Sequence, residues 1–215
     1  FTNNFNSTKY IVDVIKKLKK KLIFISSTSV YGPQEGIVYE DNLELVLKPQ
    51  SPYAKCKIKE ENYIRKNLNK INKSYVIFRF GTIYGSSPGM RFHTAVNKFC
   101  WQAINRIPLT IWKTAYQQKR PYLDLKDAVN LICFVIERNL FNGEVYNALT
   151  LNATVEQVVN VIRIYKPDLK INFVESKIMN QLSYEVLQHK IEKEGFISTG
   201  NLELSLKEYF ELIRY

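Results

Sequence analysis

Two tyrosines of this chain are each followed, four residues later, by a lysine, and this arrangement can support base catalysis. The pairs are Tyr53 with Lys57 and Tyr122 with Lys126. An unperturbed tyrosine has a pKa of about 10 and is a poor base at neutral pH. A lysine ammonium one helical turn away and the positive N-terminus of a helix both favour the phenolate. A pair of this kind on a helix could take a proton from an alcohol.

The local sequence separates the two pairs, since neither is informative alone in a chain with 14 tyrosines. Ser51 and Pro52 are typical of a helix start, with serine at the N-cap and proline in the first turn. Tyr53 then lies in the first turn and Lys57 one turn later on the same face. A serine-rich segment at 26–29 could supply a hydroxyl that holds the substrate oxygen. We expect the first pair to be catalytic and the second to be a packing pair.

The segment Gly85-Ser86-Ser87-Pro88-Gly89 fits the G-x-S-x-G pattern of serine hydrolases. The oxyanion hole of those enzymes uses the backbone N–H of the residue after the nucleophile. That residue is Pro88, which has no backbone N–H. The pattern therefore does not indicate a hydrolase.

Apolar periodicity and capping residues predict alternating helices and strands. Helices are expected over residues 8–21, 51–69, 90–105, 126–138, 154–165, 186–194 and 203–213. Strands are expected over residues 21–26, 75–80, 109–112, 144–147 and 171–174. This alternation is typical of an α/β fold with a mainly parallel sheet flanked by helices.

Composition excludes several classes of protein. The 215 residues are 46% hydrophobic, which is too apolar for a disordered chain, and three cysteines are too few for a disulfide scaffold. The longest apolar stretch, residues 128–136, is broken by Asn130, whereas a membrane-spanning helix needs about 20 residues. The histidines and cysteines show no zinc spacing, so no metal site is expected.

The formal net charge of +11 raises the question of a nucleic-acid partner. The densest basic run, residues 16–21, ends an amphipathic stretch in which Tyr10, Ile11, Val14, Ile15 and Leu18 share one face. Cations are favoured at a helix C-terminus, so we interpret the run as a solvated helix end and keep an anionic partner as the alternative. Neither a nucleic-acid nor a membrane partner is expected.

Three segments, Phe24–Gly32 (FISSTSVYG), Ser51–Lys57 (SPYAKCK) and Arg79–Gly85 (RFGTIYG), resemble the extended short-chain dehydrogenases/reductases. More narrowly they resemble the NAD-dependent epimerases/dehydratases that act on nucleotide sugars. The resemblance continues, in the family's order, through residues 90–97, 109–112, 120–127, 143–147, 180–184 and 190–196. It implies a partial Rossmann-like parallel sheet flanked by helices, followed by a smaller C-terminal substrate-binding α/β lobe.

The resemblance also implies roles for individual residues. Ser27 takes the place of the catalytic serine or threonine, and Tyr53 that of the base for alcohol oxidation, with hydride passing to NAD or NADP. Lys57 would bind the nicotinamide ribose and complete the catalytic set. Asn4 and Ser26, together with Tyr53 and Lys57, are expected near the cofactor.

Further positions match the family's substrate-binding segments, and Arg120 resembles the arginine that grips the substrate diphosphate. Thr82 stands where the family often has an asparagine. The expected substrate-binding residues are Thr28, Thr82, His93, Asn97, Arg120, Asn180 and Tyr184.

Thr28 and Ser29 bear on the reaction, because family dehydratases and decarboxylases carry acidic residues just after the catalytic serine or threonine. Uncharged residues there resemble the 4-epimerases. A non-catalytic remnant used for binding or assembly, and a related nucleotide-sugar reductase or dehydratase, remain alternatives. The sugar, its nucleotide and the choice of NAD or NADP stay open.

The eight glycines include no set with the G-x-x-G-x-x-G spacing of a pyrophosphate-binding turn. By the resemblance, about 90 to 100 residues of that half are missing, so we expect a fragment that is inactive alone. Residues 1–85 would be the C-terminal half of an NAD-binding domain. Residues 86–215 would mainly form the substrate lobe, with strands near 109–112 and 144–147 returning to the main sheet. A cytoplasmic location and a homodimer through helices near 8–21 and 53–69 are also expected.

Overall fold

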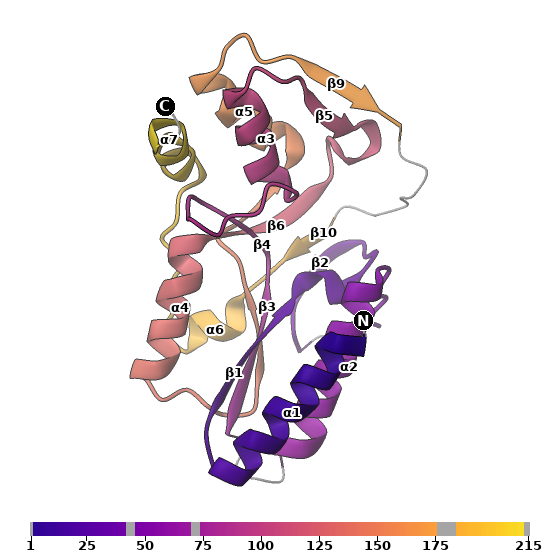
Figure 1. The fold of residues 1–215 in the computed structure, drawn as a ribbon, viewed down its shortest axis with the longest axis vertical. Coiled ribbons are helices and arrows are strands. Elements are labelled where there is room, and N and C mark those ends of the chain that lie inside the picture. The colour runs from indigo at the N-terminus through magenta and orange to yellow at the C-terminus, as the bar shows by residue number, and fades with distance from the viewer. Residues whose placement is uncertain (1, 42–45, 70–73, 176–183, 213–215) are drawn as a thin grey trace.

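The structure, a computed structural model, describes residues 2–41, 46–69, 74–175 and 184–212. Its main sheet contains three parallel strands in the order β1-β3-β7, formed by β1 (Leu22–Ser27), β3 (Tyr75–Phe80) and β7 (Val145–Ala148). In the register, Leu22 lies opposite Tyr75, and Ile77 lies opposite Val145. Helices cover both faces of this sheet (Figure 1). This is the layered arrangement that a parallel sheet requires.

Alternate residues of β3 face the two helical layers. Tyr75 and Ile77 pack with Val12, Ile15, Ile64 and Leu68 of α1 (Thr2–Leu18) and α2 (Pro52–Leu68). Val76 and Phe78 pack on the other face with α4 (Leu125–Glu137) and α6 (His189–Lys193). Every residue of β3 is buried, which explains its nearly continuous apolar sequence.

A second hydrophobic core lies beside the main sheet. It is enclosed by α3 (Ala95–Ile104), α5 (Val155–Tyr165), α7 (Leu202–Leu212) and the strands β5 (Leu109–Trp112) and β9 (Ile171–Val174). β5 and β9 form a parallel two-stranded sheet. Thr154 and Gln157 form a reciprocal capping box at the start of α5, which satisfies otherwise unpaired backbone donors.

Short strands connect the two cores. β4 (Thr82–Tyr84), β6 (Lys119–Asp124) and β8 (Leu151–Thr154) form a sheet in which only β6 and β8 are antiparallel. β2 (Gly36–Val38) pairs with β10 (Tyr184–Val186), and the 3₁₀ helices η1 (Thr28–Tyr31) and η2 (Lys113–Ala115) complete the described elements. None of the described helices combines the length and apolar character needed to span a bilayer.

The structure corrects two expectations about the lobes. The strand at 145–148 joins the main sheet as expected, but the strand at 109–112 pairs with β9 instead. Burial explains the difference: all four residues of β7 are buried, whereas Trp112 of β5 is exposed and only one face of that strand packs inward. In addition, α4 and α6 pack on the main sheet. Residues after 85 therefore contribute helices to the part of the fold that was expected to end there.

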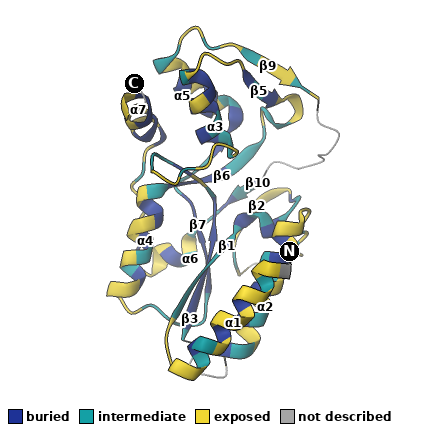
Figure 2. Cartoon of the chain, in the orientation of Figure 1, coloured by how far each residue is buried: buried dark blue, intermediate teal, exposed yellow. Residues whose placement is uncertain are grey.

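The outer surface of α1 also differs from the expectation of a single apolar face. Val12 and Ile15 are buried, whereas Tyr10, Ile11 and Leu18 are exposed. Figure 2 shows this mostly exposed outer side of α1. The helix therefore presents apolar side chains both to the core and to solvent.

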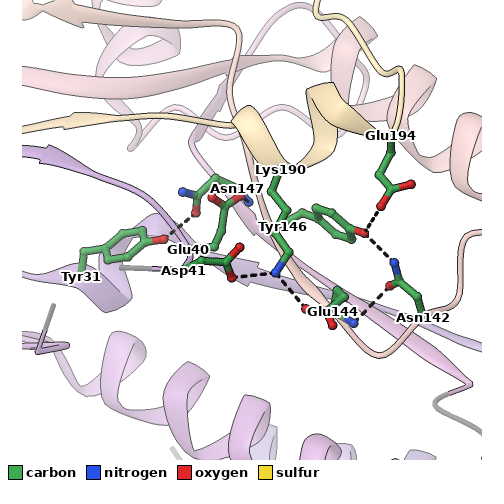
Figure 3. A network of polar contacts seen from close by, with 9 residues as sticks. All are labelled: Tyr31, Glu40, Asp41, Asn142, Glu144, Tyr146, Asn147, Lys190 and Glu194. Atoms are coloured by element: carbon green, nitrogen blue, oxygen red, sulfur yellow. Dashed lines mark hydrogen bonds and ion pairs between the residues drawn. The ribbon is translucent and has the colours of Figure 1, made fainter. Parts of the chain in front are cut away.

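Polar side chains attach the C-terminal segment to the main sheet (Figure 3). The Lys190 ammonium donates to the carboxylates of Asp41 and Glu144, each at 2.8 Å. The buried phenol of Tyr31 donates to Asn147 Oδ1 at 2.8 Å, and Asn147 Nδ2 donates to the Leu187 carbonyl. These contacts connect α6, β7 and the segment after β2.

Candidate active site

Ser27 lies at the carboxyl end of β1, where the strand turns into η1. Its hydroxyl accepts a hydrogen bond from the backbone N–H of Ser29 at 3.2 Å and caps η1. The neighbouring Ser26 is buried and donates to Glu61 Oε1 at 2.5 Å. Ser27 is therefore the less buried member of the serine pair, whereas the hydroxyl of Ser26 is bonded to a buried acid.

Tyr53 lies in the first turn of α2, as the sequence predicts. The Ser51 hydroxyl accepts from the backbone N–H of Ala54 at 3.1 Å, and Pro52 occupies the first turn. Tyr53 is half-exposed, at 49% of its full accessibility, and its phenol lies near enough to the Ser27 hydroxyl for that hydroxyl to lower its pKa. The two hydroxyls expected to act on one substrate oxygen are therefore adjacent.

Lys57 lies one turn after Tyr53 and is held at several points. Its ammonium donates to the Ile25 carbonyl at 3.0 Å and lies 3.3 Å from Glu60 Oε2. It also lies 5.8 Å from the centre of the Tyr53 ring and 4.6 Å from that of Phe24. The ammonium is thus fixed between β1 and Tyr53.

Buried acids of α2 support this arrangement. Glu60 accepts the Thr8 hydroxyl at 2.7 Å, which connects α2 to α1. Glu61 forms a two-point pair with Arg79 of β3, with Nε–Oε1 at 3.1 Å and Nη2–Oε2 at 2.8 Å. The sequence interpretation did not single out these acids, because Thr8 and Arg79, with which they bond, lie more than fifteen residues away along the chain.

The net pKa of Tyr53 is raised above its usual value of 10, so the expected lowering is wrong for the structure as it stands. Burial is the main cause, and the negative charge of Glu60 adds to it. The charge of Arg91 and the hydrogen bond with Ser27 act in the opposite direction. Glu60 also lies against Lys57 and compensates the ammonium that was expected to favour the phenolate.

A cavity of about 570 Å³ opens beside Tyr53 and Ser27, and we call it the Tyr53 cavity. Its size is within the range of small-molecule sites. It lies at the carboxyl ends of β1 and β3, where ligands bind in open α/β sheets. Five expected site residues line it together with Tyr53: Ser26, Ser27, Thr82, His93 and Asn97.

A second cavity of about 230 Å³ adjoins the first, and we call it the Arg120 cavity. Ser27 and Thr82 line both cavities. Thr28, Arg120 and Tyr184 complete the expected residues around it. The Arg120 guanidinium lies 5.6 Å from the centre of the Tyr184 ring, and burial lowers the pKa of this arginine.

Among the described residues, two expected positions, Lys57 and Asn4, line neither cavity. Asn4 is exposed on α1 and lines neither of them. Asn180 lies outside the described residues. The second tyrosine–lysine pair lines neither cavity. Tyr122 is buried in the second core, where burial raises its pKa to about 12, and Lys126 pairs with Glu208.

Other residues at the cavities were not singled out from the sequence. Arg91, Ser87 and Thr94 line the Tyr53 cavity, and Gln50 and Ser51 line the Arg120 cavity. Arg91 belongs to the segment 90–97 that supported the resemblance, and this was the one sequence feature that could have indicated it as a site residue. Its position depends on a loop that local periodicity does not predict.

Comparison with known proteins places this geometry in context. Residues 1–148 match the model of the NAD dependent epimerase/dehydratase family. The chain is 33% identical over 143 residues to an uncharacterized UDP-glucose epimerase of Bacillus subtilis, covering 65% of this chain and 43% of that protein. It is 28% identical over 179 residues to an ADP-L-glycero-D-manno-heptose-6-epimerase of Brachyspira hyodysenteriae, covering 80% of this chain and 54% of that protein. The chain thus spans about half the length of these curated relatives.

Solved structures share the fold. A UDP-glucuronic acid 4-epimerase from Bacillus cereus in complex with UDP-glucuronic acid and NAD superposes with a TM-score of 0.84 at 23% identity, covering 98% of this chain and 68% of that one. A UDP-glucose 4-epimerase from Thermotoga maritima superposes with a TM-score of 0.82 at 22% identity, covering 96% and 68%. Because the family model matches more than half of the sequence, and the fold agrees, this chain belongs to the NAD-dependent epimerase/dehydratase family.

Proposed function

We propose that this chain carries the catalytic and substrate-binding part of an NAD-dependent 4-epimerase of nucleotide sugars. The observation that carries the proposal is the meeting of the Ser27 and Tyr53 hydroxyls at the Tyr53 cavity, with Lys57 fixed one turn behind. Two hydroxyls side by side at a cavity of this size suit the oxidation of a secondary alcohol.

In this proposal the Tyr53 oxygen takes the proton of the sugar hydroxyl at C4. Ser27 donates a hydrogen bond to the same substrate oxygen and keeps it within reach of the phenol. The positive charge of Arg91 favours the phenolate, against burial and Glu60, while the Lys57 ammonium is paired with Glu60. When bound, NAD would accept a hydride from C4 and return it to the opposite face of the same carbon.

The residues present fit the nicotinamide end of NAD. The Lys57 ammonium and the Tyr53 phenol are donors of the kind that bind ribose hydroxyls, and the adjoining cavity has room for a ring. We expect Ser26, Tyr53 and Lys57 to lie nearest this end, with Asn4 farther out on α1. None of these residues is a candidate for binding the adenosine end of NAD. This agrees with the sequence, whose glycines do not have the G-x-x-G-x-x-G spacing.

The lining of the two cavities favours epimerisation over elimination of water. Among the described residues that line them, neither aspartate nor glutamate occurs. Elimination needs an additional acid and base aligned with the leaving group, whereas epimerisation needs only the alcohol oxidation and its reversal.

Assembly as a homodimer through α1 and α2 is a further part of the proposal. Tyr10, Ile11 and Leu18 are exposed on the outer side of α1, with Tyr10 at 72% of its full accessibility. An apolar stripe of this kind on a helix suits burial against a second copy. Sedimentation of the Ile11→Asp variant should show loss of a dimer that the unchanged protein forms, and a monomer in both cases would contradict this assembly.

The proposed reaction is tested by incubating the full-length protein with NAD and uridine or thymidine diphosphate sugars in heavy water. We expect a C4 epimer without deuterium on its carbons, because the hydride is retained within the site. A dehydratase would instead incorporate solvent deuterium into a deoxy-keto sugar, and that product would contradict the proposal.

A further inference from the structure

Glu61 is a buried acid of α2 that bonds to two neighbouring strands of the main sheet. Its carboxylate accepts the Ser26 hydroxyl of β1 at 2.5 Å and forms the two-point pair with Arg79 of β3. Ser26 and Arg79 lie opposite each other in the register of these strands. Glu61 is only 2% exposed and Arg79 only 6% exposed, so these contacts are shielded from water. One side chain of the helix therefore holds both strands at the same level.

The elements that Glu61 joins carry the two hydroxyls at the Tyr53 cavity. Ser26, which bonds to Glu61, directly precedes Ser27 on β1. Tyr53, Lys57 and Glu61 follow one another at intervals of four residues, which places them along one side of α2. The contact between Glu61 and Ser26 thus fixes the strand that carries Ser27 against the helix that carries Tyr53.

Arg79 extends this connection to the segment after Ser27. The central carbon of its guanidinium lies 5.0 Å from the centre of the Tyr31 ring in η1, and Tyr31 is fully buried. Ser27 is therefore held from both directions, through Ser26 before it and through η1 after it. Both attachments lead to the pair of Glu61 and Arg79.

Neither member of this pair lines the Tyr53 cavity or the Arg120 cavity, so any effect on a ligand there passes through other residues. Stability alone does not require charges at these positions, because well-packed apolar residues of similar volume are often as stable as a buried ion pair. A two-point pair between a planar guanidinium and a carboxylate instead fixes direction as well as distance. Such geometry is suited to holding neighbouring elements in one arrangement.

We infer that Glu61 and Arg79 are positioning residues, which hold the Ser27 hydroxyl beside the Tyr53 phenol without touching the substrate themselves. The inference rests on the proposed function, since it takes these two hydroxyls as the reacting pair. A displacement of about 1 Å can lower a rate by about 100-fold even when its cause lies far from the reacting atoms. Loosening the pair should therefore lower kcat more than it changes KM.

The first test uses Ser26→Ala in the full-length protein, which removes the hydroxyl bonded to Glu61 and leaves the ion pair intact. We expect kcat to fall by about tenfold, with KM for the sugar changed by less than about twofold. Without NAD, NMR titration should show the Tyr53 pKa higher by about one pH unit, because the Ser27 hydrogen bond that lowers it is lost. Since no cofactor is present, this titration separates positioning from a direct contact between Ser26 and NAD.

Ser205→Ala provides the matched control. Ser205 is a buried serine of α7 that donates to the buried carboxylate of Asp124, and neither residue lines the two cavities. This variant loses the same kind of hydrogen bond, so its melting temperature should fall comparably while its kcat and Tyr53 pKa match those of the unchanged protein. A Ser26→Ala variant that also keeps both values would overturn the inference.

The second test separates positioning from stability. Glu61→Leu and Arg79→Met each leave one buried charge unpaired and should lower the melting temperature, whereas the double variant removes both charges and should regain much of it. We expect the double variant to retain a reduced kcat and a raised Tyr53 pKa. Return of both to normal together with stability would overturn the inference. Absence of sugar turnover in the unchanged protein would instead contradict the proposed function, and the Tyr53 titration would still decide the positioning role.

Discussion

The phenol of Tyr53 lies between groups that favour and groups that oppose its ionised form. Burial and Glu60 raise its pKa, whereas Arg91 and the Ser27 hydroxyl lower it. Glu60 is itself fixed by the Thr8 hydroxyl and by Lys57. The basicity of the proposed catalytic group therefore depends on a buried acid that lies outside the cavity.

This balance predicts the effect of Glu60→Gln. Removing the negative charge stabilises the phenolate, so the pKa of Tyr53 should fall and the phenolate should persist to lower pH. Titration of the Tyr53 ring carbon by NMR, assigned with Tyr53→Phe, measures this directly. In the full-length protein, the acid limb of the pH–rate profile should move in the same direction.

Glu156→Gln is the control for this variant, since Glu156 is a partly exposed acid of α5 that bonds to Gln117 and lines neither cavity. Its pH profile should match that of the unchanged protein. A Tyr53 pKa that stays constant or rises in Glu60→Gln would show that Glu60 does not act on the phenol.

At the scale of elements, the start of α2 determines where the proposed base, Tyr53, lies. The Ser51 hydroxyl caps the helix by accepting from the Ala54 N–H at 3.1 Å, and Tyr53 follows within the first turn. A shift of this turn would move the phenol relative to Ser27. The Ser51 cap therefore stabilises α2 and also fixes the position of the Tyr53 phenol.

We expect Ser51→Ala to lower the free energy of unfolding by about 1 kcal/mol, the usual effect of losing an N-cap. Ser51→Asp should retain most of the stability, because an aspartate oxygen accepts the same hydrogen bond. Urea unfolding followed by circular dichroism measures both. Equal stability of the alanine variant and the unchanged protein, or an aspartate variant as weak as alanine, would contradict the cap.

The sequence predicts well those elements whose apolar residues and capping residues lie within the element itself. The predictions of a strand at 75–80 and of a helix capped by Thr154 agree with the structure. In both cases the apolar pattern or the capping residues lie close together in the sequence. The short strands β2 and β4 were missed, because each has three residues and partners far along the chain. Pairing of this kind leaves no local signal.

The proximity of Ser27, Tyr53 and Lys57 was predictable for a related reason. Ser27, Tyr53 and Lys57 lie in linear motifs, and their meeting follows from a strand and a capped helix. Glu60 and Arg91 act on Tyr53 through tertiary placement, so their roles became visible only in the structure. The same limit explains the wrong direction of the expected Tyr53 pKa.

At the scale of the whole molecule, β1 occupies an edge of the main sheet. Among the described residues it pairs only with β3, and most of its side chains are partly exposed. An apolar edge of this kind invites pairing with a further strand. In the proposed function the Tyr53 cavity holds only the nicotinamide end, whereas dinucleotide affinity comes largely from a pyrophosphate on a glycine-rich turn.

We therefore expect these 215 residues, prepared by themselves, to bind NAD weakly or not at all and to associate or aggregate. Calorimetric titration with NAD, combined with thermal melting and light scattering, measures these properties. Micromolar NAD binding by a well-folded monomer would contradict the expectation and would point to a cofactor cradle elsewhere in the described residues.

The central claim is that Tyr53 is the base in a nucleotide-sugar epimerase, and the turnover of Tyr53→Phe in the full-length protein tests it most directly. We expect a loss of about 100-fold or more, the usual scale for a general base, with substrate binding largely intact. Tyr122→Phe, which alters a tyrosine buried in the second core, should keep near-normal turnover. Near-normal turnover of Tyr53→Phe would contradict the assignment of Tyr53 as the base.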